Sequence, residues 1–206
     1  MSQLRVRRTF LRDCLIAAGG AGVGVFSPQL LRWQFGNTAV ADEKIIAGGH
    51  EERLNALGIE LPAPAKPVAV YVPAVLTGNL LFTAGHIPWT AEGKPLAGRL
   101  GQDLTVEQGA AIARQIGLSI LTTVRQSIGS LDRVVRLVKA TGMVNCTSDF
   151  SQQSQVINGF SELMIQVFGE SAGKAARSAV GMNSLPAGVP VEIEAIFEVH
   201  AAGLSG

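Results

Sequence analysis

An arginine and two glutamates stand in one apolar stretch near the end of the chain, RSAVGMNSLPAGVPVEIEAIF, which spans residues 177–197. Arg177 opens this stretch, and Glu192 and Glu194 lie inside it. A guanidinium can hold a planar carboxylate through two parallel hydrogen bonds, and a nearby glutamate can act as a general base or acid. These residue types favour a site in which the guanidinium grips a small carboxylic acid.

The stretch is typical of two strands joined by a turn at residues 185–188. In a symmetric hairpin register, Gly181 lies opposite Glu192. Arg177 then shares the face of the glutamates and lies about 13 Å along the strand from the position facing Glu192, which leaves room for a small acid. Glu194 is nearer, either as a diagonal ion-pair partner of Arg177 or as a second acid in the cleft. The alternative is a solvated sheet face whose surface ion pair contributes under ~1 kcal/mol.

Other site chemistries have little support in the sequence. The three histidines have no ligand spacing with one another or with a cysteine, so no metal site is expected. Gly-x-Ser-x-Gly nucleophile motifs and phosphate-binding Walker loops are lacking as well. Cys146, the one cysteine beyond the first 41 residues, ends an apolar run and is expected to be a buried core residue.

The first 41 residues have the layout of an export signal. The sequence RRTFLR at residues 7–12 is followed by a glycine-rich apolar run over about 14–26 and by the small-x-small sequence at 39–41. This order resembles a twin-arginine signal peptide and predicts a periplasmic or secreted protein cleaved before Asp42. The apolar run is short for a membrane span, so no stable anchor is expected after cleavage. The alternative is an amphipathic helix with chance arginines.

The charge of the chain is unevenly distributed. The first 41 residues hold five of the 17 basic residues and one of the 16 acidic residues, which leaves 12 basic and 15 acidic residues and a net charge of −3. Surfaces that bind nucleic acid are basic, so no nucleic-acid partner is expected.

Hydrophobic periodicity predicts an α+β domain behind a leading segment, residues 42–64, which holds a short helix and a Pro/Ala-rich lead-in. The expected elements are strands around a turn at 77–79, a loop over 88–103, a helix over 105–128 that begins with a capping box of Thr105 and Gln108, a strand over 133–146, a second helix from a cap at Asp149 or Ser151 to Val167, and the hairpin. The order is β-β-α-β-α-β-β, with two helices packed on one face of a mixed sheet.

Three segments carry a resemblance to a known family: ARSAVGMNSLPAGVPVEIEAIFEV, YVPAVLTGNLLFTAGHIP and VINGFSELMIQVFGE. They resemble the RidA/YjgF family, also called endoribonuclease L-PSP-like proteins, and are nearest to its chorismate-mutase-like bacterial branch. The resemblance covers about residues 65–199, which implies a domain over 65–200 and a tail over 201–206. It also implies a chorismate-mutase-like fold and a homotrimer with ligand clefts between subunits.

The resemblance further implies an activity and a set of site residues. Better-studied family members hydrolyse reactive imines and enamines, such as 2-iminobutanoate and 2-aminoacrylate, to 2-keto acids and ammonia, without metal or cofactor. By match of motif, Arg177 would grip the substrate carboxylate and Glu192 would activate water or relay protons. Tyr71 matches the tyrosine of the first hairpin, Asn158 matches a polar helix residue near the site, and Gly85 would keep the backbone close to the ligand.

Three positions depart from the family pattern. Ala84 replaces a small hydroxyl residue, His86 takes the position usually held by Gln and adds a titratable group, and Ala179 stands where deaminating members often carry Cys. The sequence therefore predicts an exported deaminase of imine or enamine acids. A non-catalytic trimer that binds a small carboxylate or a partner protein in the same cleft is the alternative, and a nuclease is the third possibility, which the net acidic domain disfavours.

Overall fold

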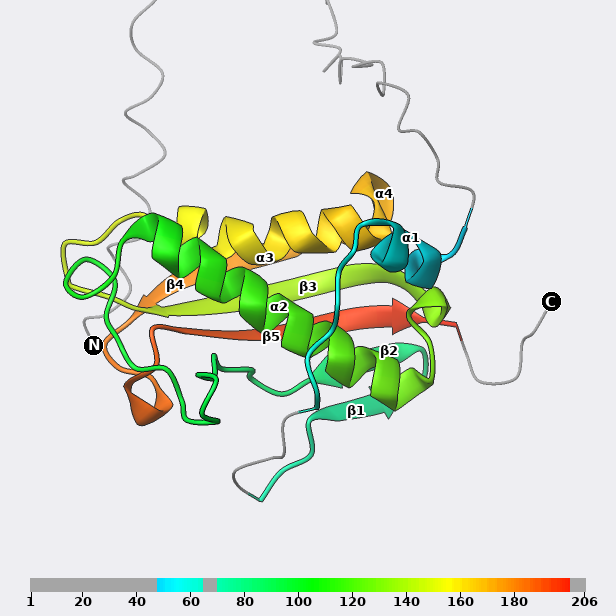
Figure 1. Cartoon of the computed structure of the whole chain (residues 1–206), viewed down its shortest axis with the longest axis horizontal. Helices are drawn as coiled ribbons and strands as arrows, with labels where there is room; N and C mark the ends of the chain where they lie inside the picture. The colour runs from blue at the N-terminus through cyan, green and yellow to red at the C-terminus, as the bar shows by residue number, and fades with distance from the viewer. Residues whose placement is uncertain (1–47, 65–69, 201–206) are drawn as a thin grey trace, which may run out of the picture. The chain divides into compact units, whose positions relative to one another are not determined.

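The computed structural model describes residues 48–64 and 70–200, so the predicted signal peptide at 1–41 and the tail at 201–206 lie outside the described residues. The elements follow the predicted order, with short helices added (Figure 1). They are α1 His50–Ala56, β1 Ala74–Thr77, β2 Leu80–Thr83, α2 Val106–Ile128, β3 Val134–Asn145, α3 Gln153–Phe168, α4 Glu170–Gly173, β4 Ala176–Met182 and β5 Val191–Val199, with single 3-10 turns at Leu131–Arg133 and Pro186–Gly188. In this part of the chain, none of the helices combines the length and the hydropathy that a membrane span requires.

The five strands form one mixed sheet in the order β1-β2-β5-β3-β4. The β3–β4 pair is parallel, and the other neighbouring pairs are antiparallel. Helices α2 and α3 lie side by side across one face of this sheet (Figure 1). The predicted α+β architecture, with two long helices on one face of a mixed sheet, is therefore confirmed.

The predicted hairpin of β4 and β5 is wrong, because β3 lies between these two strands. Glu192 of β5 pairs with Met143 of β3, whereas Gly181 of β4 pairs with Val144 of β3. The apolar residues of β5 are almost fully buried, so this strand takes a central position, while β4 is a more exposed edge strand. Consecutive strands are not always neighbours in a sheet, and the segment between β4 and β5 crosses over the end of β3 instead of making a tight turn.

The ends of the two long helices agree with the predicted caps and stops, except at the start of α3. Thr105 caps α2, accepting a hydrogen bond from the Gln108 backbone while the Gln108 side chain accepts one from the Thr105 backbone, so the predicted capping box is confirmed. Helix α3 begins after Gln152 without a side-chain cap, so the predicted cap at Asp149 or Ser151 is wrong. Burial of its apolar face, which includes Phe160, offsets the missing cap.

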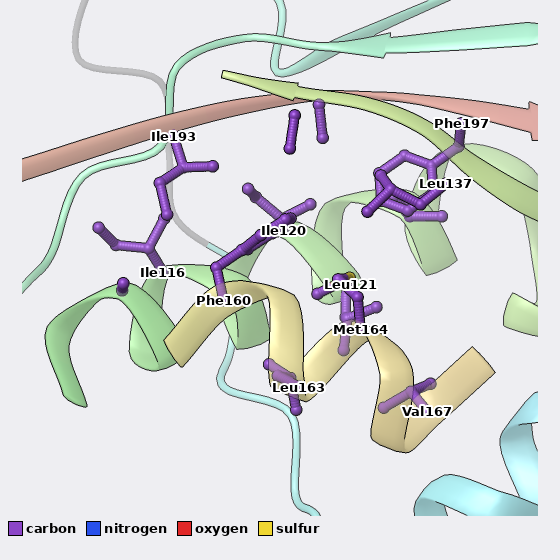
Figure 2. Close-up of a cluster of buried hydrophobic side chains, with 14 of the residues drawn as sticks. Ile116, Ile120, Leu121, Leu137, Phe160, Leu163, Met164, Val167, Ile193 and Phe197 are labelled. Atoms are coloured by element: carbon purple, nitrogen blue, oxygen red, sulfur yellow. The ribbon is translucent and has the colours of Figure 1, made fainter. Parts of the chain in front are cut away.

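The core fills the space between the helices and the sheet. Figure 2 shows Ile116 and Ile120 of α2 beside Phe160 of α3, with Ile193 and Phe197 of β5 above them. Each of these side chains has 0% exposure. Cys146 is a free, buried thiol with 6% exposure at the end of β3, as predicted.

The helices α2 and α3 approach most closely at Gly159. A Cβ built on Gly159 would lie 1.9 Å from the backbone carbonyl oxygen of Ala110. Replacing Gly159 by alanine is expected to lower the free energy of unfolding by about 1–3 kcal/mol, because the helices must separate and this cost exceeds the gain in helix propensity. Urea unfolding of the Gly159→Ala variant measures the change, with Glu162→Ala on an exposed turn of the same helix as control. Equal stability of both variants would show that the helix pair adjusts freely.

The leading segment packs on the domain. Leu54 of α1 has 2% exposure, and the Glu51 carboxylate accepts hydrogen bonds from Arg125 of α2 and from the backbone of Leu131. The Thr122 hydroxyl donates to the carbonyl of Pro62, which holds the lead-in against α2. Residues 48–64 therefore contribute to the same core as the strands.

Candidate functional site

The centre of the site is Glu192 on the face of the sheet that the helices leave uncovered. Its neighbours Val191 and Ile193 point into the core with 0% exposure, so Glu192 points to the opposite side. A Cβ built on Gly85 would lie 1.9 Å from Oε1 of Glu192. The chain after β2 is held in this place by two backbone hydrogen bonds of 2.8 and 3.0 Å between His86 and Ile193. Only a glycine at position 85 lets the backbone approach the carboxylate so closely.

The surroundings of Glu192 change its protonation. Burial, and to a smaller extent the negative charge of Glu194, raise the pKa of the Glu192 carboxyl. Glu194 is exposed on the same face, opposite Thr141 of β3. A half-buried carboxyl with a raised pKa keeps its proton to a higher pH than a free glutamate does, which suits a group that accepts and returns a proton as a general acid or base.

A second group of predicted residues lies at the edge strand β4. The Arg177 guanidinium donates hydrogen bonds of 2.9 Å to Oδ1 of Asn158 and to Oγ of Ser161, and one of 3.3 Å to the carbonyl of Ser154. The structure therefore brings together Arg177 and Asn158, which the resemblance assigned to one site, and adds two serine contacts from α3. These partners fix the orientation of the guanidinium at the sheet edge.

The prediction that Arg177 shares a face with the glutamates is wrong. Arg177 pairs with Ala140 of β3, which pairs with Ala195 of β5, and directly paired residues point to the same side of a sheet. That side is the helix side, whereas Glu194 and Glu192 point to the other. The diagonal ion pair of Arg177 with Glu194 is not formed, since the described ion pairs join Arg125 to Glu51, Arg136 to Glu198 and Lys174 to Glu170.

His86 lies on the helix side of the sheet. Its Nδ1 is 2.8 Å from the carbonyl of Ala84, which can only accept, so Nδ1 carries the proton and Nε2 accepts from the Thr123 hydroxyl at 2.8 Å. Burial lowers the pKa of the imidazole, and the hydrogen bond to Ala84 opposes this only in part. The structure therefore places His86 as a neutral link between the sheet and α2, away from the Glu192 carboxyl.

The neutral state of His86 predicts a pH dependence of stability. A histidine whose folded pKa lies below its unfolded value of 6.5 binds fewer protons in the folded state, so stability falls as pH falls below about 6.5. Glu192, whose folded pKa is raised, acts in the opposite direction. Unfolding midpoints of the parent and of His86→Gln at pH 7.5 and 5.5 separate the contribution of His86 from that of Glu192. On acidification, the variant is expected to lose less stability than the parent. An equal loss in both proteins would show that folding does not lower the pKa of His86.

Tyr71 lies far from Arg177 within one chain. It precedes β1 with 45% exposure, and β1 and β4 are the two edge strands of the sheet. Four strand spacings separate these edges, about 19 Å. The predicted residues thus form three groups, with Glu192, Gly85 and Glu194 at the centre, Arg177 and Asn158 at one edge, and Tyr71 toward the other.

A polar cluster that was not predicted lies on the glutamate face. Lys139 of β3 donates a 2.7 Å hydrogen bond to the Ser178 hydroxyl of β4, and Thr141 lies between Ser178 and Glu194 in the sheet. The alternation of β3 places Lys139 and Thr141 on one face, but only the strand order reveals that this is the face of Glu194. In the part of the chain that the structure describes, no three His, Cys, Asp or Glu side chains gather as they would to hold a metal ion.

The fold and this face define an α+β domain whose helices cover one side of the sheet and whose acidic groups lie on the other. The sequence profile of the family described as "YjgF/chorismate mutase-like, putative endoribonuclease" matches residues 51–189. The chain belongs to this family, and the predicted family resemblance is confirmed.

Several relatives share most of their length with this chain. Protein TCP17 of Trypanosoma cruzi is 41% identical over 157 residues, which cover 76% of this chain and 98% of TCP17. Among solved structures, protein Atu1372 of Agrobacterium tumefaciens is 38% identical with a TM-score of 0.65, covering 74% of this chain and 94% of its own. A "putative endoribonuclease" of Shewanella oneidensis is 29% identical with a TM-score of 0.69, covering 74% of this chain and 100% of its own. These likenesses support the chorismate-mutase-like fold.

Proposed function

We propose that the chain hydrolyses small imine or enamine carboxylic acids to 2-keto acids and ammonia. The observation that carries this proposal is the Glu192 carboxyl, which is half-buried against the Gly85 backbone with a raised pKa. Addition of water to a C=N carbon needs a group that removes a proton from water and later returns one, and such a carboxyl suits this task. Membership of the YjgF/chorismate mutase-like family supports the proposal.

The proposed reaction is balanced without a further reactant. The Glu192 carboxylate takes a proton from water as the water oxygen bonds to the imine carbon, and the C=N electron pair moves to nitrogen, which receives this proton from Glu192 to give a carbinolamine. Glu192 then takes the proton of the carbinolamine hydroxyl and transfers it to nitrogen as the C–N bond breaks, which releases ammonia and leaves the 2-keto acid. Arg177 holds the substrate carboxylate through paired hydrogen bonds and so orients the imine carbon.

We propose that the complete site forms between the subunits of a homotrimer. Arg177 and Glu192 lie on opposite faces of one sheet, so one chain does not present both groups to one substrate. The uncovered sheet face also carries large apolar side chains, with Val75, Phe82 and Val180 exposed by 53%, 39% and 41%. A second copy of the chain that covers this face would bury them and would bring the edge strand β4 of one subunit toward Glu192 of the next.

The test is keto-acid release from an imine made in situ by an amino-acid oxidase. The purified protein is expected to speed the release above the spontaneous rate, and Arg177→Ala is expected to lose this effect. Thermal stabilisation by 2-ketobutanoate, with no acceleration over a broad panel of imines, would replace hydrolysis by binding of a small carboxylate alone. Equal rates of Arg177→Ala and the parent would remove Arg177 from the site.

Gly85 offers a test that leaves the catalytic side chains unchanged. In Gly85→Ala the new Cβ displaces the Glu192 carboxyl, which is the movable end of a side chain, so the fold is expected to persist. Keto-acid release is expected to fall by about 10²-fold, because small misplacements of a reacting group have effects of this size. The melting temperature and the assay are measured on the same sample. Full activity would show that the proton-moving group lies elsewhere.

We also propose that the protein works outside the cytoplasm. The arginine pair, the apolar run and the small-x-small sequence within residues 1–41 occur in the order of a twin-arginine signal peptide. N-terminal sequencing of periplasmic material should begin near Asp42. Export that continues after replacement of Arg7 and Arg8 by lysine would exclude this pathway.

A further inference from the structure

A groove of about 830 Å³ lies on the outer side of α2. Its floor is formed by Gln115, Leu118 and Ser119 of this helix. The helical period places these residues opposite to Ile116 and Ile120, whose fully buried side chains face the core. The helix layer therefore separates the groove from the uncovered sheet face, so the proposed cover of that face by a second copy of the chain leaves the groove accessible.

Both walls of the groove are fixed on α2 by hydrogen bonds. One wall is the lead-in at Pro62, which crosses α2 (Figure 1) and whose carbonyl accepts a 2.9 Å hydrogen bond from the Thr122 hydroxyl. The other wall is a small hairpin over residues 88–96, held by backbone hydrogen bonds of 2.8 and 3.0 Å across it. The Gln115 side chain donates a 3.1 Å hydrogen bond to the carbonyl of Trp89 and so ties this hairpin to α2. The groove is therefore formed in the absence of a ligand, which lowers the entropy cost of binding.

The lining of the groove combines an apolar surface with a single charge. Trp89 of the hairpin, Leu61 of the lead-in and Leu118 of α2 supply its large apolar side chains, and all three are partly exposed. Glu60, which is exposed, is the one charged residue that lines the groove within the described ranges. A ligand that fits this lining has an apolar body and a positive charge.

The hydrogen-bonding groups of the floor favour the same charge. One amide hydrogen of Gln115 is engaged with the hairpin, and the Ser119 hydroxyl donates to the Gln115 carbonyl at 3.4 Å, so Oε1 of Gln115 and Oγ of Ser119 remain as acceptors. The indole N–H of Trp89 and the second amide hydrogen of Gln115 are neutral donors. An ammonium group finds acceptors, a carboxylate and the indole ring, which is the strongest aromatic partner of a cation. A carboxylate ligand would instead meet the like charge of Glu60.

We propose that this groove binds an amphiphilic organic cation, a compound with a protonated amine a few bonds from an aromatic or branched apolar group. The apolar group lies against Trp89, Leu61 and Leu118, and the ammonium lies at Glu60 and the acceptors of α2. The volume of about 830 Å³ falls within the usual range of small-molecule sites, about 300–1,000 Å³. The groove contains no residue of the proposed hydrolytic site, so its ligand is a compound other than the imine acid.

The test uses 2-phenylethylamine as the probe and the backbone amide resonances of the full protein as the readout. The probe is expected to shift the amides of Thr90, Gln115 and Ser119 to saturation. Two compounds with the same phenyl body change the charge, since 2-phenylethanol is neutral and 3-phenylpropanoate is an anion. They are expected to bind about threefold and about tenfold more weakly than the amine. Binding of the anion as tight as that of the amine, or the lack of a saturable shift at these amides, would overturn the proposal.

Two variants separate the charge from the apolar surface. Glu60→Gln changes an exposed side chain, so the fold is expected to persist, and the Kd of the amine is expected to rise about threefold while that of 2-phenylethanol stays unchanged. Trp89→Leu is expected to raise both Kd values about fivefold or more. Glu162→Gln on the exposed side of α3 is the control and should change neither value.

Each variant can contradict one half of the assignment. An unchanged Kd of the amine in Glu60→Gln would overturn the position of the ammonium group, and this result does not depend on whether Trp89→Leu folds. Unchanged Kd values in a folded Trp89→Leu would overturn the contact of the apolar group with the indole.

Discussion

Replacement of Glu192 by glutamine is expected to lower kcat/KM for imine hydrolysis by about 10²- to 10⁴-fold, the usual contribution of a positioned general acid or base. Glutamine keeps the size of the side chain but cannot accept or return a proton at working pH. The oxidase-coupled release of keto acid measures the loss. The matched control is Glu198→Gln, because Glu198 lies on the same face of β5 and makes a surface ion pair with Arg136 at 3.5 Å. The control is expected to keep the parent rate.

The pH profile separates a proton-moving role from a structural one. The carboxylate form of Glu192 starts the reaction, so activity falls as pH falls through the raised pKa of Glu192. The charge of Glu194 contributes to that raised pKa, so Glu194→Gln lowers the pKa of Glu192 and moves the acid limb of the profile to lower pH. An acid limb that stays in place in Glu194→Gln, or a Glu192→Gln variant with the parent rate, would contradict the assignment.

Elements with strong local signals were predictable from the sequence. The capping box at Thr105 and the glycine at position 129 bound α2 at the two ends that the structure has. The short turn at Gly78, with φ of 59°, joins β1 to β2 as predicted. In each case neighbouring residues determine the local backbone, so the local sequence alone predicts where the helix ends and where the turn lies.

The partners of β4 and β5 could not be predicted in the same way. Alternation shows which residues of a strand share a face, but it does not state which strand lies beside it. The predicted face of Arg177 was wrong because it assumed a direct pairing of β4 with β5. In the structure, the face of each β4 residue is set by its partner in β3, and the face of that partner by its own partner in β5. The burial pattern distinguishes the central strand from the edge strand in part, because β5 alternates buried apolar residues along its whole length and β4 does not.

The candidate site was predictable in its residue types more than in its arrangement. Gly85 and Glu192 are far apart in the chain, and only the resemblance assigned both of them to one site; in the structure, the Gly85 backbone lies against the Glu192 carboxylate. Lys139 was overlooked because a single lysine in a strand is usually a solvated residue. Its surroundings come from two other strands, since Ser178 of β4 accepts its hydrogen bond and Glu194 of β5 lines the same hollow as Lys139.

The separation of Arg177 and Glu192 predicts that two inactive variants restore each other. Arg177→Ala alone is expected to lose about 10²-fold or more of kcat/KM through loss of the bidentate grip on the carboxylate. In a trimer with sites between subunits, a chain that lacks Arg177 still supplies Glu192, and a chain that lacks Glu192 still supplies Arg177. Co-expression of the two variants in equal amounts should rebuild about one site in four, because half of the subunits offer each intact group.

The recovery distinguishes a shared site from one within a single chain. Co-expressed Arg177→Ala and Glu192→Gln are expected to reach about a quarter of the parent activity per subunit, at least tenfold above either variant alone. The control is co-expression of each variant with the double variant Arg177→Ala/Glu192→Gln, in which one of the two groups is missing from every subunit and no recovery is expected. Mixed oligomers that form but remain inactive would show that the two groups do not act across an interface. Since Arg177 faces α3 and Glu192 faces the uncovered side, recovery in the mixed oligomer is the outcome that the sheet geometry supports.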